Sequence, residues 1–338
     1  MAINKRLIKS NDEGGGASFN TVLYDGNDAN PRTISGVGFQ PDLVWIKPID
    51  AAESHALFDV QRPAGERLVT NSTSAAGQLS PAYAELTTDG FIVGGASYND
   101  SATGDYVAWC WKAGGTAVTN THGDITSDVS ANVDAGFSIV KYTGDGTSGA
   151  TVGHGLNSAP DMIIIKNLNV VESWATWHSS LPSVNSYMYL DSNQETNIST
   201  DVFRGTSSST ITVGTHALVN SNTKSYIAYC FAEKAGFSKF GSYSGNNSAT
   251  GPTITTGFEP AFVMIKRTDS TGNWVILDNK RDTSNPIDKT LNPNLSAVES
   301  TANDIDFNAT TFQLKSTNAD TNASGTDNYI YMAFANQF

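Results

Sequence analysis

Residues 38–47 read GFQPDLVWIK, and the chain returns to this pattern twice. The second version is PDMIIIK at 160–166, and the third is GFEPAFVMIK at 257–266. Each version is a short apolar run, rich in β-branched and aromatic residues, that begins at a proline. This is typical of a buried β-strand. We therefore treat the stretch as the first landmark of an internal repeat.

A second landmark follows each of these runs. It reads YVAWCW at 106–111, YIAYCF at 226–231 and YIYMAF at 329–334. Two weaker landmarks recur in the same order. One precedes the proline, at 19–24, 137–142 and 237–243, and the other lies between the two strong landmarks, at 55–59, 174–178 and 274–278. Because four landmarks recur three times in one order, the sequence predicts three homologous domains.

The landmarks set the expected boundaries of these domains. The prediction is an N-terminal arm at 1–18, domains at 19–115, 135–235 and 236–338, and a linker at 116–134. The linker assignment follows from a polar composition rich in Gly, Ser, Thr and Asn. No long segment has the 3.6-residue periodicity of an amphipathic helix. The sequence thus predicts an all-β protein made of three tandem antiparallel β-sandwiches, of jelly-roll or concanavalin-like type.

The YVAWCW strand has two different faces, because successive side chains of a strand point to opposite sides. Val107, Trp109 and Trp111 share one face, and we expect these large side chains to fill the core of their own sandwich. Ala108 and Cys110 lie on the other face, where small side chains would let another layer approach closely. In the second copy Ile227, Tyr229 and Phe231 likewise lie opposite Ala228 and Cys230, and in the third Ile330, Met332 and Phe334 share one face. The pattern predicts a central strand that is covered on both faces.

Composition excludes several classes of protein. The 338 residues carry a net charge of −13, which argues against a nucleic-acid binder that follows phosphates. No apolar run approaches the length of about 20 residues that spans a membrane, so we expect no membrane insertion. The cations near the N-terminus are not followed by an apolar stretch, so no secretory signal is predicted.

Few residues have the spacing that catalysis or metal binding needs. Cys110 and Cys230 occupy equivalent positions of two copies, and we expect two buried thiols rather than a disulfide. The histidines have no zinc-binding spacing. The GDGTSG stretch at 144–149 matches a dinucleotide fingerprint, but no helix-forming sequence follows it, so a hairpin loop is the better interpretation.

One position in the repeat holds an ionisable residue three times. Asp59, His178 and Asp278 end the same landmark in the three copies. A catalytic role is one interpretation of this trio. We favour solvent-facing polar residues at the end of a strand. The tryptophans of the landmarks could stack on sugars, but their place in strands favours core packing.

Loops rich in Asn and Asp follow the first strand of each copy. Their residues are candidate ligand-binding groups: Asp25, Asn27, Asp28, Asp145, Asn246 and Asn247. Calcium is one ligand to consider, because hard cations prefer several oxygen ligands. The few acidic residues in each loop favour ordinary turns. Separately, Lys5, Arg6 and Lys9 make the N-terminal arm cationic. It is a candidate attachment arm for an acidic partner surface, and the alternative interpretation is a solvated start of the chain.

Taken together, the repeated GFxPDLVxIK motif, TTDGFIVG at 87–94 and YVAWCWKAGG at 106–115 resemble the uncharacterised β-domain repeats of structural proteins in tailed bacteriophages, notably marine and cyanobacterial ones. The resemblance covers nearly the whole chain. It implies a virion protein built from β-sandwiches, and it provides no catalytic residues to transfer.

The resemblance sets the functional expectation. We expect a non-enzymatic virion structural protein without a cofactor, either a fibre-like tail appendage or an outer-capsid decoration. It would be made in the host cytoplasm and would contact other virion proteins. A homo-oligomer is expected, a trimer by analogy with fibres. The alternative is a carbohydrate-binding module that recognises a glycan on the host surface.

Overall fold

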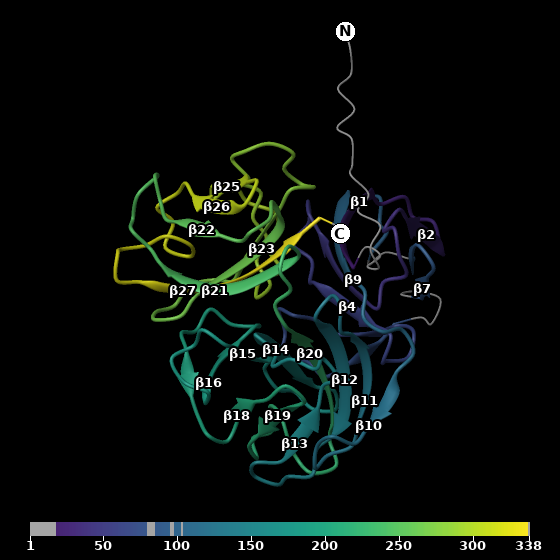
Figure 1. Cartoon of the computed structure of the whole chain (residues 1–338). Helices are drawn as coiled ribbons and strands as arrows, with labels where there is room; N and C mark the ends of the chain where they lie inside the picture. The colour runs from purple at the N-terminus through teal and green to yellow at the C-terminus, as the bar shows by residue number, and fades with distance from the viewer. Residues whose placement is uncertain (1–17, 80–84, 95–97, 103, 337–338) are drawn as a thin grey trace.

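The computed structural model describes residues 18–79, 85–94, 98–102 and 104–336, and these residues form strands, turns and loops. They fold into three β units grouped around one centre (Figure 1). In this part of the chain no helix is long and apolar enough to cross a membrane. The predicted arm residues Lys5, Arg6 and Lys9 lie outside the described residues.

The first unit contains a four-stranded and a three-stranded sheet. The larger sheet has the order β1 (Phe19–Asp25), β9 (Asp105–Trp111), β3 (Leu43–Pro48), β4 (Ala56–Asp59). The smaller has the order β2 (Arg32–Ser35), β8 (Gly90–Val93), β7 (Leu86–Thr87). A two-stranded ribbon joins β5 (Glu66–Arg67) to β6 (Gly77–Gln78).

The second unit repeats this plan with a longer main sheet. That sheet has the order β10 (Val118–Asn120), β11 (Ser127–Asn132), β12 (Phe137–Thr143), β20 (Ser225–Phe231), β14 (Met162–Asn167), β15 (Ala175–His178), β16 (Ser186–Tyr189), β17 (Asn197–Ile198). Its small sheet has the order β13 (Thr151–Gly153), β19 (Thr210–Val213), β18 (Phe203–Thr206).

The third unit returns to the simpler plan. Its main sheet has the order β21 (Ser238–Ser244), β27 (Asn328–Ala335), β23 (Pro260–Arg267), β24 (Val275–Asp278). Its small sheet has the order β22 (Thr253–Thr255), β26 (Thr311–Leu314), β25 (Ile305–Asn308). All named strand pairs in the three units are antiparallel, so the expected all-β, antiparallel fold is confirmed.

The predicted linker is wrong as an unstructured connection. Within 116–134, β10 and β11 pair with each other, and β11 then pairs with β12. The alternation of Val118, Val129 and Ala131 with polar residues is enough for a hairpin once β12 offers a free edge, even though Ser, Thr and Asn dominate the composition. The hairpin belongs to the second unit and extends its sheet.

Within each unit the two sheets enclose a hydrophobic core. In the first unit this core contains Val44 and Ile46 from β3, Phe91 from β8, and Ala108 and Cys110 from β9. The equivalent core of the second unit contains Ala228 and Cys230. The small side chains of the last strand therefore point into the sandwich, opposite to the orientation that we predicted.

The large side chains of the same strand point to the centre of the molecule instead. Val107, Trp109 and Trp111 belong to a core shared by all three units, together with Tyr229 and Phe334. The alternation was recognised correctly, but the two faces were assigned to the wrong layers. The reason is geometric: the central space lies between three sheets and takes large side chains, while Phe58 and Phe91 already occupy much of the sandwich core.

Three equivalent aromatic residues meet at this centre. Trp111, Phe231 and Phe334 each come near the end of the last strand of their unit. Their ring centroids lie 6.3, 5.8 and 6.0 Å apart, and all three pairs are edge-to-face. Such pairs are favourable beyond the area that they bury. The repeat therefore generates a pseudo-threefold axis inside a single chain.

A repeated backbone hydrogen bond closes the three units into a ring. The amide nitrogens of Ala76, Thr196 and Glu299 each donate to a carbonyl of the following unit, at Leu168, Thr268 and Ile49, over 3.2, 2.9 and 3.0 Å. The third of these bonds returns from the last unit to the first. The same kind of contact therefore joins every pair of neighbouring units. It occurs between units that follow each other in the chain and also between the last unit and the first.

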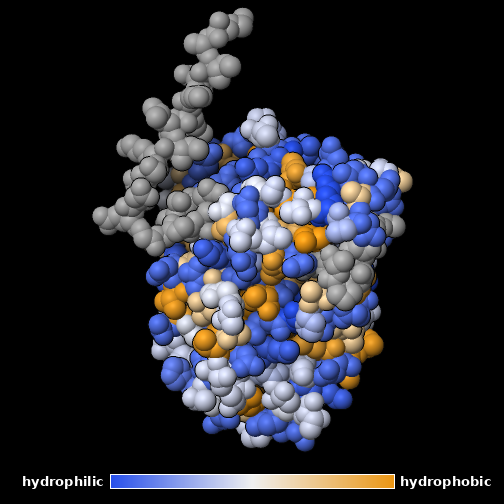
Figure 2. All heavy atoms as spheres, turned by 90° about the vertical axis from the view of Figure 1, so that its right-hand side faces the viewer, coloured by the Kyte–Doolittle hydropathy of each residue, from blue (hydrophilic) through white to orange (hydrophobic). Residues whose placement is uncertain are grey.

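The described surface visible in Figure 2 is mainly hydrophilic. On the face shown in Figure 2, apolar side chains lie in small groups between polar ones. Isolated apolar residues such as Val171 and Ile198 are 71% and 68% exposed, which is normal for a surface. Most large apolar side chains are buried in the three sandwiches or in the shared core.

Candidate functional site

The Asn/Asp loops are organised by a buried asparagine that recurs in every unit. Asn99, Asn220 and Asn322 are each 0% exposed. Asn220 shows the pattern most fully: its Oδ1 accepts the amide of Asp145 over 2.9 Å, and its Nδ2 donates to the carbonyls of Thr147 and Gly214 over 2.9 and 3.0 Å. Each loop is therefore held from inside by an amide side chain.

The candidate ligand residues take part in the same networks. Asn27 accepts a hydrogen bond from the Asn99 Nδ2, and Asp145 accepts one from Asn220. The Asn246 amide donates to Asn322. Asp28 and Asn247 adopt positive φ angles of 59° and 50°, a backbone conformation that asparagine and aspartate tolerate. Asp25 ends β1, where it lies opposite Asp105.

The structure does not bring these residues together into one site, because each group belongs to a different unit. Hydrogen bonds from Ser101 hold the pKa of Asp28 below its usual value, because they stabilise the ionised carboxylate. This is expected of an aspartate whose side chain stabilises a turn. Within the described ranges, no group of three or more His, Cys, Asp or Glu residues could hold a metal ion. The loops act as turns in this fold.

The three ionisable residues that end the landmark between the two strong ones do not lie where we expected them. Asp59, His178 and Asp278 are 6%, 0% and 0% exposed, so the solvent-facing assignment is wrong. Each reaches the last strand of another unit. Asp59 accepts from the Tyr229 hydroxyl over 2.7 Å, and Asp278 accepts from the Trp109 indole over 3.1 Å. These side chains bond the units together around the ring.

Neighbouring groups fix the protonation of His178. Its Nδ1 accepts the amide of Ser180, so its Nε2 carries the proton and donates to the Tyr331 carbonyl over 3.1 Å. Burial lowers the pKa of His178 to about 4, against a weaker opposing effect of the Tyr331 hydrogen bond. The imidazole is neutral at pH 7 and has a structural role between the second and third units.

The state of His178 gives an expected pH dependence. An unfolded histidine titrates near pH 6.5, so between pH 6.5 and 4 the unfolded chain binds a proton that the folded chain excludes. The contribution is complete above pH 6.5 and is lost as the pH falls toward 4. From pH 7 to pH 4.5, the free energy of unfolding of the wild type should fall by about 2–3 kcal/mol more than that of His178→Gln.

Urea denaturation at the two pH values measures this difference. The glutamine keeps an N–H donor for Tyr331 but does not titrate, so other acid-sensitive groups cancel in the comparison. Equal losses in both proteins would show that His178 is protonated in the folded state.

A buried lysine also recurs, and sequence reasoning treated it only as the end of a strand. Lys47, Lys166 and Lys266 are each 0% exposed. Their ammonium groups donate to backbone carbonyls, such as those of Pro48 over 2.6 Å and Glu172 over 2.7 Å. Desolvation lowers their pKa values to about 8, 8 and 7. A lysine at one position of three apolar strands is the signal that could have identified them.

The sequence predictions for the cysteines and for the tryptophans of the landmarks are confirmed. Cys110 and Cys230 are free and buried. Burial raises the pKa of the Cys230 thiol to about 12, which leaves it protonated and unreactive. The tryptophans of the landmarks are at most 6% exposed, so they pack in cores and do not offer a stacking surface: Trp45, Trp174, Trp177 and Trp274.

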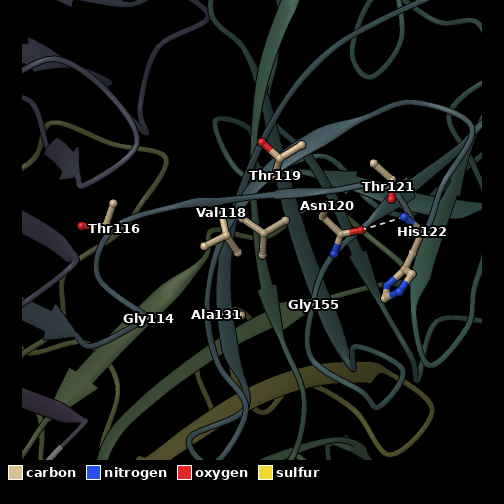
Figure 3. A pocket seen from close by; sticks show the side chains of 10 residues that line it. Gly114, Thr116, Val118, Thr119, Asn120, Thr121, His122, Ala131 and Gly155 are labelled. Atoms are coloured by element: carbon tan, nitrogen blue, oxygen red, sulfur yellow. Dashed lines mark hydrogen bonds between the residues drawn. The ribbon is translucent and has the colours of Figure 1, made fainter.

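A pocket of about 420 Å³ lies beside the β10–β11 hairpin (Figure 3). Its lining contains Thr, Gly, Val and Ala residues together with Asn120 and the exposed His122. The Asn120 Oδ1 accepts the amide of His122 over 2.9 Å, as the dashed line in Figure 3 marks. A glycine is required at 155, because its φ is +75° and a Cβ there would lie 2.9 Å from the Val129 side chain.

The lining of this pocket determines the ligands that it could accept. It contains no Asp, Glu, Lys or Arg, so it offers hydroxyl and amide groups and the His122 imidazole beside the apolar surfaces of Val118 and Val129. Neutral ligands with hydroxyl groups and apolar faces, such as a pyranose, match this mixture, and the volume is typical of small-molecule sites. The β10–β11 hairpin of the second unit contributes Val118, Asn120 and Val129 to this lining.

Comparisons with known proteins place the chain in a family. No curated protein and no solved structure matches the chain significantly. One family model, described as a domain of unknown function (DUF7483), matches residues 15–337. That single match includes all three units and the hairpin between the first two. The chain therefore belongs to the DUF7483 family of domains of unknown function.

Proposed function

We propose that this chain is a non-enzymatic structural protein of a tailed-phage virion. The observation that carries the proposal is the closed ring of three β units around one aromatic core. The recurrent buried ionisable groups, such as Asp59 and His178, bond one unit to the next. This use of ionisable residues supports a rigid scaffold. The assignment to a phage particle is drawn from the resemblance of the repeated motifs.

The ring also bears on the place of the protein in the particle. A string of three sandwiches would give a fibre its reach, whereas units packed about a shared core make a compact body. Of the two locations, we therefore favour an outer-capsid decoration over a fibre-like tail appendage. The cationic N-terminal arm would attach to an acidic surface of another virion protein.

Immunogold electron microscopy of purified particles tests this proposal, with antibody raised against the chain. We expect label over the capsid. Label on the tail would keep the structural role and change the location. Particles without label, when the antigen is accessible and present at the expected amount in a blot of the lysate, would overturn the proposal.

The expected oligomer is a separate part of the proposal. A trimer was expected by analogy with fibres, yet one chain already places three equivalent units around an axis. Sedimentation velocity at micromolar concentration measures whether chains also associate. A single species of 35.9 kDa would contradict self-association of the isolated chain.

The pocket beside β10 and β11 favours carbohydrate binding as a second function. A glycan array at pH 7 would identify a neutral sugar, and Asn120→Ala should weaken its binding by about tenfold or more through loss of one amide hydrogen-bonding group. Thr250→Ala, in an exposed loop of the third unit, is the matched control. No bound glycan, or equal binding by both variants, would remove this function from the pocket.

A further inference from the structure

A second groove, of about 370 Å³, lies between the second and third units. We call it the second-interface groove and define it by six of its lining residues: Ser180, Glu195 and Ile198 from the second unit, and Ser242, Asp269 and Asn328 from the third. Because the chain repeats three times, the same position can be compared at another interface of the ring.

At the first interface, a glutamine and a lysine occupy the positions of the two serines. Gln61 corresponds to Ser180, since each backbone amide bonds to the side chain two residues before it. Lys141 corresponds to Ser242, because each comes directly before a tyrosine of its unit's first main strand. That tyrosine pairs in both units with the first tyrosine of the unit's last strand. The Gln61 Nε2 donates to the Ile139 carbonyl over 3.0 Å. The Lys141 ammonium donates to the Gln61 carbonyl over 3.4 Å.

The chain's own carboxamide and ammonium therefore bridge the first interface. Serines at the second interface are too short to make the same contacts, which leaves a groove. The second interface also gains negative charge where it lacks the lysine. The uncharged Ala75 and Asn169 of the first interface correspond to Glu195 and Asp269 of the second. Ala75 and Glu195 each precede the residue whose amide donates across the interface, and the side chains of Asn169 and Asp269 each accept the backbone amide of the first residue of a last strand.

Nearby cations neutralise the groove only in part. Arg267 bonds to both Asp269 and Asp327, over 3.0 and 2.7 Å, so one guanidinium serves two carboxylates. Glu195 is exposed and adds a third carboxylate. The Thr196 hydroxyl oxygen is buried at the groove and has no hydrogen-bond partner among the described residues. Relative to the first interface, the second lacks the Lys141 ammonium and gains the Glu195 and Asp269 carboxylates, with Arg267 in place of the neutral Asn167. The buried Lys266 ammonium donates to the Asn193 carbonyl and has an equivalent, Lys166, at the first interface.

We propose that the second-interface groove binds a lysine side chain of a partner protein, whose ammonium takes the role that Lys141 has at the first interface. The Glu195 and Asp269 carboxylates would attract the ammonium, and the Ile198 side chain would contact its methylene stem. This inference adds a partner chemistry to the proposed structural role. It is tested on the isolated chain, so its failure would leave the immunogold result unaffected.

The test is a titration followed by NMR of isotope-labelled isoleucine methyl groups, with Nα-acetyl-lysine methylamide as the probe. At pH 7 and low salt we expect saturable shifts at Ile198 and Ile330, which both line the groove. The Nε-acetylated probe, which lacks the charge, should bind about tenfold more weakly or not at all. Glu195→Gln with Asp269→Asn should have a similar effect, because the charge attraction is lost.

The first interface supplies matched variants. Ser242→Lys introduces an internal ammonium, as Lys141 does at the first interface, and should abolish binding in a chain whose circular dichroism is unchanged. The converse change, Gln61→Ser and Lys141→Ser with Ala75→Glu and Asn169→Asp, should create a second binding position. Equal binding of the charged and acetylated probes, no shift at about 10 mM probe, or saturable binding of glucosamine when the lysine probe does not bind would each overturn the proposal.

Discussion

Asp59→Ala is expected to lower the free energy of unfolding by about 3–5 kcal/mol, the usual effect of removing one partner of a buried ion pair. The carboxylate lies 2.7 Å from the Arg62 Nε, and both side chains are at most 1% exposed. The remaining Arg62 contacts include the backbone carbonyls of Leu57 and Glu66. Without Asp59, the guanidinium would remain buried beside these carbonyls, which carry no compensating negative charge.

The same substitution also removes a bond between units, because Asp59 accepts the Tyr229 hydroxyl. Tyr229→Phe isolates that part and should cost only about 1 kcal/mol. Guanidinium chloride denaturation of the two variants and of their combination gives the coupling between them. A loss below about 1 kcal/mol for Asp59→Ala would mean that water or another group compensates Arg62, and the buried pair would then contribute little.

The second large effect is expected for Trp111→Ala, which should cost about 3–5 kcal/mol by leaving a cavity in the shared core. The indole is 2% exposed and contacts aromatic rings of the other two units, at Phe231, Phe262 and Phe334. Because these rings pack on one another, all three units should lose stability together, although the substitution lies in the first.

Hydrogen exchange measured by mass spectrometry can follow each unit separately. In Trp111→Ala, amides of β20 and β27 should lose protection to a similar extent as those of β9. Val171→Ala is the control, because that side chain is 71% exposed and the change should stay within about 0.5 kcal/mol. Faster exchange confined to the first unit would show that the three units fold independently and that the shared core transmits little stability.

Local sequence patterns predicted the strands well. The runs that begin with a proline became β3, β14 and β23, and the tyrosine-led runs became β9, β20 and β27. These segments are β-branched, aromatic and bounded by turn residues, so local preference and burial act in the same direction. The β10–β11 hairpin was missed because its polar composition resembles a loop, and only the free edge of β12 makes it a strand pair.

The candidate sites show the limits of composition. The Asn and Asp residues of the loops were recognised, but the buried asparagines that hold them, such as Asn220, come 75 residues later than the loop. The recurrence of Asp59, His178 and Asp278 was also recognised. Their burial was missed, because a polar residue at the end of a strand is normally at the surface and nothing local indicates that another unit covers it.

The amino-acid sequence by itself determined three antiparallel β units, the position of their main strands and the fact that the last strands of the first two units have a large face and a small face. Only the tertiary structure decided what covers each face. A two-residue periodicity separates the sides of a strand but does not identify its neighbours. Those neighbours come from remote parts of the chain, as in the contact between His55 and the Asn292 carbonyl, 237 residues apart. Closure of the ring turned the large faces inward and created both the shared core and the second-interface groove.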